Sequence, residues 1–209
     1  MTENRKIRRS TGFTLVEIIV GLAIIGALFA IGAPIALRAI HTAKMSSVGY
    51  DCNILVRRAK SEAIKKNSPV VVKHDSALQV LTAFVDRHGA TVNDPPDFSY
   101  GPDLSVAPSA TDHEISQCVL PAGVSWGGPP TDAFITVGFT TVGTERLAIL
   151  EPDGSVQDIG TFRFGDERGN YLAIQIAPTA TARVTLLKWD EATVKWREQG
   201  EEGKKWVWY

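Results

Sequence analysis

The strongest constraint in the sequence is an apolar run over residues 13–37, in which Glu17 is the single ionisable side chain. A helix needs about 20 apolar residues to span a bilayer, so this run is long enough. Four basic residues and one acidic residue precede it, and this bias predicts a cytoplasmic amino end and an exported remainder. A secretory signal peptide, cleaved near residues 30–33, is the competing interpretation, but its hydrophobic region is usually shorter. We therefore expect a single-pass membrane protein.

Glu17 distinguishes this run from a plain membrane anchor. A carboxylate inside a membrane helix is costly unless it is paired, so such a residue usually has a function. A shallow glutamate that reaches the lipid headgroups is the alternative that Glu17 alone would leave open. The neighbouring residues decide between the two.

Residues 11–17 read Thr-Gly-Phe-Thr-Leu-Val-Glu, and an apolar helix follows them. This string resembles the class III signal of type IV prepilins and type II secretion pseudopilins. The resemblance implies that residues 1–12 are a basic leader, that prepilin peptidase cuts between Gly12 and Phe13, and that Phe13 is then N-methylated. It also implies that residues 13–37 form the transmembrane and assembly helix, in which Glu17 neutralises the Phe13 ammonium of a neighbouring subunit. Such pairing gives each buried charge a partner.

Pro34 lies in this helix at a position where the family commonly carries a proline. Proline removes a backbone hydrogen bond and kinks a helix. The resemblance implies that residues 26–34 are a stretch that can partly melt in a filament. A kinked membrane helix with ordinary small-residue packing is a compatible interpretation.

After Arg38 the pattern becomes amphipathic, and it predicts a helix over residues 38–67 that ends at Asn67-Ser68-Pro69. Cys52 lies on its apolar stripe, and Cys118 lies in a predicted strand. Two cysteines are too few for a disulfide scaffold. An exported domain could join them in one disulfide, and two packed free thiols are the alternative.

Residues 68–209 read as short strands separated by turn signals, without a second long helical period. The predicted fold class is α+β, with the long helix packed on an antiparallel β-sandwich of pilin-like form, exported to the periplasm. Residues 93–112 are rich in Pro, Ser and Asp and predict a long loop. The predicted strands are 70–73, 78–86, 115–120, 133–139, 146–150, 155–159, 161–164, 171–177 and 183–189.

Two strings narrow the resemblance. Residues 58–72 and 149–156 resemble the helix-end and strand-turn signatures of GspH/FimT-like minor pilins and pseudopilins. Residues 178–183 lack the glycine-arginine pair expected before the closing strand, which leaves the final strand pairing open.

The carboxyl-terminal tail, residues 188–209, contains four of the five tryptophans of the chain, together with five basic and five acidic residues. The pattern predicts a hairpin of residues 189–197 with 205–209, whose aromatic face would be a candidate protein contact. Nucleic acid is a less favoured partner, because the charges cancel. Without residues 1–12 the chain has 18 basic and 22 acidic residues, so no global field attracts DNA.

Motifs of catalysis are absent from the sequence. The four histidines are scattered, and no nucleophile elbow or phosphate-binding loop occurs. Asp94, Asp97 and Asp103 do not have the spacing of a recognised calcium site, so a solvated loop is preferred there. We expect no enzyme activity, no cofactor and no metal.

The sequence therefore predicts a structural subunit of a type II secretion pseudopilus or a type IV pilus, in the tip or assembly-priming complex. Its expected location is the inner membrane and then the filament, and its expected partners are other pilins or pseudopilins and prepilin peptidase. A minor pilin that binds DNA during transformation is the second hypothesis. A single-pass anchored domain with no filament role is the third.

Overall fold

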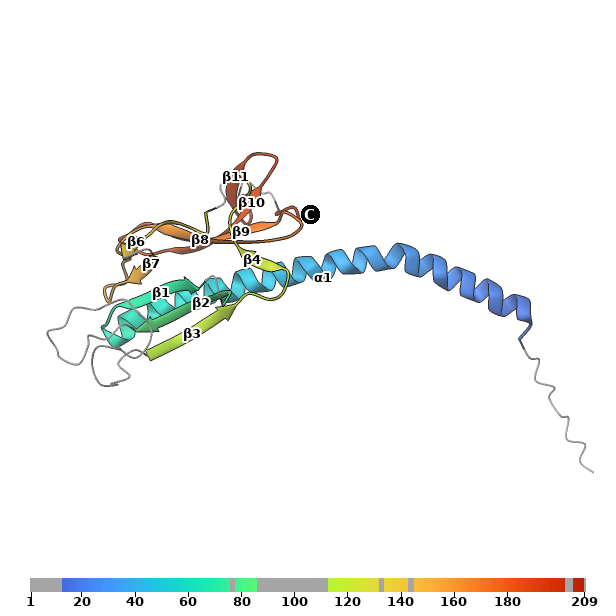
Figure 1. Cartoon of the computed structure of the whole chain (residues 1–209), viewed down its shortest axis with the longest axis horizontal. Coiled ribbons are helices and arrows are strands. Elements are labelled where there is room, and N and C mark those ends of the chain that lie inside the picture. The colour runs from blue at the N-terminus through green and yellow to red at the C-terminus, as the bar shows by residue number, and fades with distance from the viewer. Residues whose placement is uncertain are drawn as a thin grey trace, which may run out of the picture. The chain divides into compact units, whose positions relative to one another are not determined.

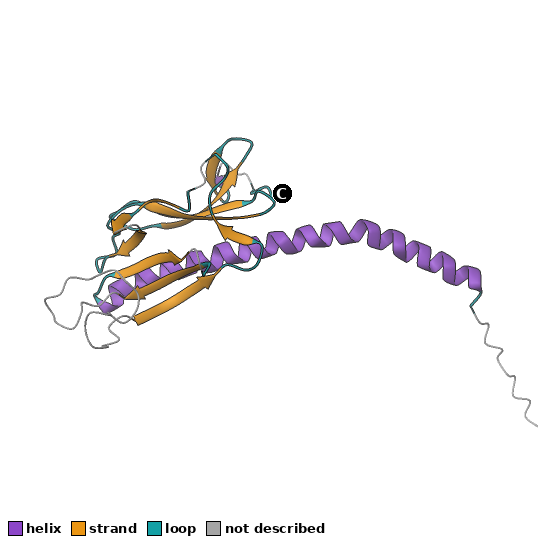
Figure 2. Ribbon diagram, in the orientation of Figure 1, coloured by secondary structure: helices purple, strands orange, loops and turns teal. Residues whose placement is uncertain are grey.

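The computed structural model describes residues 13–75, 78–85, 113–131, 134–142, 145–201 and 205–208. The chain forms two compact units, Met1–His41 and Thr42–Tyr209. One long helix, α1 (Leu15–Lys66), belongs to both units, and every described strand belongs to the second (Figure 1; Figure 2). The α+β class is confirmed, with the helix packed against antiparallel sheets.

Helix α1 ends in hydrogen bonds that its sequence encodes. The amide of Ser68 donates to the carbonyl of Ala63 at 3.3 Å, and the amide of Asn67 donates to the carbonyl of Ile64 at 3.4 Å. Asn67 has a φ of 49°, the left-handed conformation that asparagine tolerates. This is a Schellman cap, and Pro69 follows it. The predicted helix end is therefore confirmed.

The strands form two antiparallel sheets. The first has the order β3-β2-β1-β7-β6, and the second has the order β11-β10-β9-β8-β4, with β5 also paired to β8. The strands are β1 (Val70–Asp75), β2 (Val80–Val85), β3 (His113–Val119), β4 (Val124–Trp126), β5 (Thr136–Gly138), β6 (Thr140–Val142), β7 (Glu145–Leu150), β8 (Gly160–Asp166), β9 (Tyr171–Ile176), β10 (Val184–Asp190) and β11 (Lys195–Glu198).

The main core of the second unit joins the helix to both sheets. Residues of α1 such as Met45, Leu55 and Val56 are at most 2% exposed and belong to the same cluster as Phe162 of β8 and Val72 of β1. A smaller cluster lies on the opposite face of the first sheet and consists of Val71, Phe84, Leu147 and Ile149. The buried face of α1 is the stripe that the three- and four-residue spacing predicts.

Helix and second sheet approach closely at Gly49. A Cβ atom there would lie 2.7 Å from Leu172 Cδ1 and 3.2 Å from Leu186 Cδ2. Both leucines project from the helix-facing side of the second sheet, from β9 and β10. The absence of a side chain at residue 49 therefore lets the two layers pack tightly.

Several strand predictions are wrong. Strands β4 and β6 were not predicted. Each is only three residues long, too short to show an alternation of apolar and polar residues. Residues 155–159 form no strand, since the turn before them leaves only the bridge between Leu150 and Val156. Strand β10 pairs with β9, which settles the pairing that the sequence left open. The predicted loop over residues 93–112 lies outside the described residues.

The tail forms a different hairpin from the predicted one. Trp189 pairs with Trp196 across β10 and β11, and residues 205–208 are not a strand. Asp190 closes the turn, because its carboxylate accepts the hydroxyl of Thr193 at 2.8 Å and the amide of Ala192 at 3.2 Å. The prediction missed this turn because aspartate caps turns without the glycine or proline that marks most hairpins.

Candidate functional site

The start of α1 is a capping box made by Thr14 and Glu17. The amide of Glu17 donates to Thr14 Oγ1, and the amide and hydroxyl of Thr14 both donate to Glu17 Oε2, each at 3.2 Å. The two side chains thus satisfy amides that the first helical turn leaves unpaired. A carboxylate is also favoured there by the helix dipole.

Glu17 therefore has a partner within its own chain. This partner was not predicted, although the Thr-x-x-Glu spacing of a capping box is present in residues 14–17. Phe13 lies directly before the box and is 82% exposed. Gly12, the predicted last residue of the leader, lies outside the described residues.

The first part of α1 exposes its apolar side chains on all sides. Its leucines, isoleucines, valines and phenylalanine up to Ile40 are each more than half exposed. Among the described residues, α1 is the one helix long and apolar enough to cross a membrane. A helix that is apolar all round matches a membrane environment better than water.

Pro34 lies inside α1, and the helix continues through it. A Cβ atom on Gly21, Gly26 or Gly32 would meet nothing within 4 Å. The stretch over residues 26–34 is helical in this isolated chain, and its melting in a filament stays a prediction.

Cys52 and Cys118 form a disulfide that ties α1 to strand β3, with their Cα atoms 5.3 Å apart. Cys52 is fully buried and Cys118 is 5% exposed. The bridge crosses the main core and closes a loop between residues 66 positions apart in sequence. It holds the helix on the first sheet at the sheet's edge strand.

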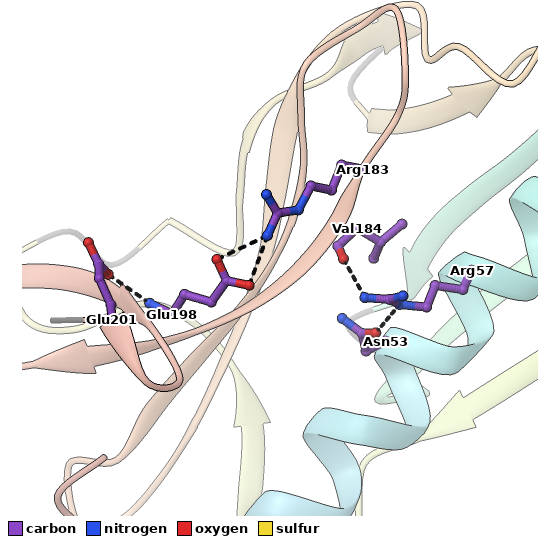
Figure 3. Close-up of polar contacts among 6 residues, drawn as sticks. All are labelled: Asn53, Arg57, Arg183, Val184, Glu198 and Glu201. Carbon is purple, nitrogen blue, oxygen red and sulfur yellow. Dashed lines mark hydrogen bonds and ion pairs between the residues drawn. The ribbon is translucent and has the colours of Figure 1, made fainter. Parts of the chain in front are cut away.

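Polar contacts hold the helix to strand β10 (Figure 3). Arg57 donates from Nε to Asn53 Oδ1 at 2.7 Å and from Nη2 to the carbonyl of Val184 at 2.8 Å. The carbonyl is the first of β10, so the guanidinium fixes the point at which this strand starts. The arginine side chain thereby acts as a clamp between α1 and the second sheet.

The tryptophans of the tail are half-buried and make contacts within the chain. Trp206 Nε1 donates to the carbonyl of Arg197 at 3.3 Å, and the Trp208 ring lies 5.0 Å from Lys188 Nζ. The carboxylate of Glu201 accepts the amide of Glu198 at 3.0 Å. These contacts cover backbone groups of β11, which is an edge strand and would otherwise be a template for aggregation.

Lys188 is 2% exposed beneath this tail. Burial lowers the pKa of its ammonium, and the negative charges of Asp166 and Asp190 partly oppose that shift. The hydrogen bond from Thr193 lowers the pKa of Asp190. The groups that cause these shifts lie in β8 and in the hairpin of β10 and β11.

The described residues contain no group of three or more His, Cys, Asp or Glu side chains placed to hold a metal ion. Asp94, Asp97 and Asp103 lie outside those residues.

Comparison with known families bears on the first helix. The prokaryotic N-terminal methylation motif matches residues 7–33, so the chain carries the type IV prepilin-like signal. The match covers the start of α1 and the residues before it, and no part of the unit Thr42–Tyr209. No curated protein and no solved structure matches the chain.

Proposed function

We propose that this chain is a minor pilin or pseudopilin, a structural subunit of a type II secretion pseudopilus or a type IV pilus. The observation that carries the proposal is the methylation motif at residues 7–33, which coincides with the start of an exposed apolar helix. In this function prepilin peptidase removes residues 1–12, and the subunit joins the tip or priming complex. The two strings that resemble GspH/FimT-like subunits support the minor class.

The proposed location follows from charge and hydropathy. The basic residues before Phe13 favour a cytoplasmic leader, and the apolar part of α1 then crosses the inner membrane. The unit Thr42–Tyr209 would lie in the periplasm before and during assembly. During assembly, the apolar first part of α1 would leave the lipid and contact the helices of neighbouring subunits.

The mechanism that we propose gives the Glu17 carboxylate two successive partners. Before assembly it caps its own helix through Thr14, which keeps polar groups satisfied in lipid. After cleavage, the Phe13 ammonium of a neighbour supplies an opposite charge that a threonine cannot. The gain of this charge pair would favour the filament over the free subunit.

Mass spectrometry of the mature amino terminus tests this function. We expect a chain that begins at Phe13 and carries one added methyl group on its amino nitrogen. The matched control is the same chain in cells that lack prepilin peptidase, which should retain residues 1–12. An intact Met1 in peptidase-positive cells, or a terminus near Ala33, would contradict the proposal.

A further inference from the structure

The chain that follows β11 lies beside the first turns of α1 in the unit Thr42–Tyr209. We call its described residues, 199–201 and 205–208, the tail end. The hydroxyl of Tyr50 donates to Gln199 Oε1 at 2.9 Å, so the tail end contacts the helix there. Tyr50 lies nearer to Thr42, the first residue of this unit, than to the end of α1 at Lys66. The contact therefore lies toward the end of the unit at which α1 enters it.

Two tryptophans of the tail end lie at the same end of the unit. The Trp208 ring lies 5.0 Å from Lys188 Nζ, and Lys188 pairs with Leu172 across β10 and β9. Leu172 packs against Gly49 of α1. The rings of Trp206 and Trp208 lie edge to face, with their centroids 6.0 Å apart. Both rings are thus placed near the residues of α1 that precede Tyr50.

The tail end combines buried and exposed apolar surface. Trp206 and Trp208 pack against the main core but are only half-buried. Val207 lies between them and is 63% exposed. An indole ring has an apolar body and a polar N–H group, and such rings are favoured at the headgroup level of a bilayer. The composition of the tail end is therefore typical of a segment at a membrane interface.

The length of the apolar part of α1 favours the approach of this unit to a bilayer. The helix from Leu15 to Leu37 is about 35 Å long, whereas the hydrocarbon core of a bilayer is about 30 Å thick. A helix longer than the core tilts, and interfacial tryptophan, tyrosine, lysine and arginine side chains set its orientation. Tilting would bring one side of the attached unit toward the lipid headgroups.

We propose that the tail end binds the headgroup region of the membrane that α1 spans, before the subunit enters a filament. The inference rests on the proposed function for the membrane topology. Lipid is the occupant that the chain itself supplies, because the helix segment before Thr42 is the candidate membrane span. The contact would hold the unit in one orientation on the bilayer, and it would be released when the subunit leaves the membrane.

The contact is apolar and not electrostatic. Among the described residues of the tail end, Lys205 is the exposed base and Glu201 is the exposed acid, so their charges cancel. A polybasic segment, by contrast, depends on anionic lipids and is weakened by salt. We therefore expect the tail end to bind a zwitterionic bilayer at any salt concentration.

Fluorescence quenching in nanodiscs tests the contact. The full chain is inserted into nanodiscs of zwitterionic lipid, which carry a nitroxide spin label either at the headgroup or at the end of an acyl chain. The ratio of tryptophan emission with and without the label is measured. We expect the headgroup label to quench more than the deep label, because indole rings favour the interface. Added salt should leave this quenching unchanged.

Two double variants locate the contact. Trp206→Phe/Trp208→Phe should lose most of the quenching by the headgroup label. The control Trp189→Phe/Trp196→Phe removes the same number of indole rings from paired positions of β10 and β11 and should keep it. Neighbouring residues of a strand point to opposite faces, so Trp189 points away from Lys188 and from the ring of Trp208.

A single variant tests the contact without altering a ring. Val207→Glu places a carboxylate on the exposed surface of the tail end, where substitution has little effect on stability. A carboxylate retains its water, so the quenching by the headgroup label should fall. The matched control Val207→Ile keeps the site apolar and should be quenched as the unaltered chain is. Near-ultraviolet circular dichroism of each variant verifies that the fold is retained.

Three outcomes would overturn the inference: no quenching by the headgroup label, equal loss in the two double variants, or undiminished quenching of Val207→Glu. Failure of the proposed topology is separately visible, because such a chain would not co-elute with nanodiscs in gel filtration. That result would overturn the topology and this inference together. A chain that stays in the nanodisc with unquenched tryptophans loses only this inference.

Discussion

At the scale of single residues, Thr14 and Glu17 share the capping box, and the proposed function gives Glu17 a second role in assembly. Both are needed for the capping box, but only Glu17 carries a charge. Substitution at each position can therefore separate the cap from the charge. Glutamine at residue 17 can still accept the Thr14 amide, since glutamine also serves in capping boxes.

We expect Glu17→Gln to be processed normally but to enter filaments poorly, because it keeps the cap and loses the charge. Thr14→Ala keeps the charge and should assemble, with a helix start weakened by about 1 kcal/mol. Glu17→Ala loses both the cap and the charge. It should be processed normally and should assemble poorly. Immunoblots of sheared filaments and of membranes measure the two steps. Normal incorporation of Glu17→Gln would remove the charge pair from the mechanism.

The backbone at residue 138 requires glycine. Its φ is +75°, and a Cβ atom there would lie 2.2 Å from the carbonyl oxygen of Ile159. We expect Gly138→Ala to lower the free energy of unfolding by about 2–4 kcal/mol, through backbone strain and displacement of β8. Gly169→Ala is the matched control.

Gly169 has a similar φ of +86° with nothing within 4 Å of an added Cβ. Its substitution should cost only the left-handed conformation, about 1–2 kcal/mol. Urea unfolding in detergent, followed by tryptophan fluorescence, compares the two. Equal losses would mean that the contact with Ile159 has no energetic weight.

At the scale of elements, α1 is joined to each sheet by a different device. The disulfide joins it to β3 of the first sheet, and the Arg57 clamp joins it to β10 of the second. The disulfide restricts the unfolded chain and the clamp does not, because a covalent link persists when the fold is lost. The two devices should therefore respond differently to reductant.

We expect Cys52→Ala/Cys118→Ala to lower the free energy of unfolding by about 2–4 kcal/mol. The unaltered chain, unfolded and refolded in reductant, should lose a similar amount, while the double variant should be indifferent to reductant. Thermal unfolding by circular dichroism gives the comparison. An unaltered chain that melts at the same temperature with and without reductant would show that the bridge adds no stability.

The elements also show how far sequence reasoning extends. The helix and its end were predictable, because apolar periodicity and the residues after Lys66 carry strong local signals. Most longer strands were predictable for the same reason. Strands β4 and β6 and the Asp190 turn were not, because the two strands are too short to show an apolar alternation and one aspartate side chain creates the turn. Arg57 reaches Val184 of β10 through a tertiary contact that no local pattern encodes.

At the scale of the whole molecule, the two units differ in where their apolar side chains lie. The described residues of the first unit, 13–41, expose them, whereas the unit Thr42–Tyr209 buries many of its own in a core shared by helix and sheets. We expect a chain that starts at Thr42 to fold in water and to unfold cooperatively. Gel filtration and thermal unfolding test this against the full chain, which should require detergent. Aggregation of the shortened chain would mean that its core depends on the first unit.

The redox state of Cys52 and Cys118 depends on the compartment in which the domain lies. Cytosolic reductants keep thiols reduced. A domain that has not been translocated would therefore carry two free thiols, which a maleimide reagent can label after denaturation. A translocated domain would carry none. Under the proposed topology, the ratio of the two forms on a gel would give, in one sample and without any fused reporter, the fraction of copies that have crossed the membrane.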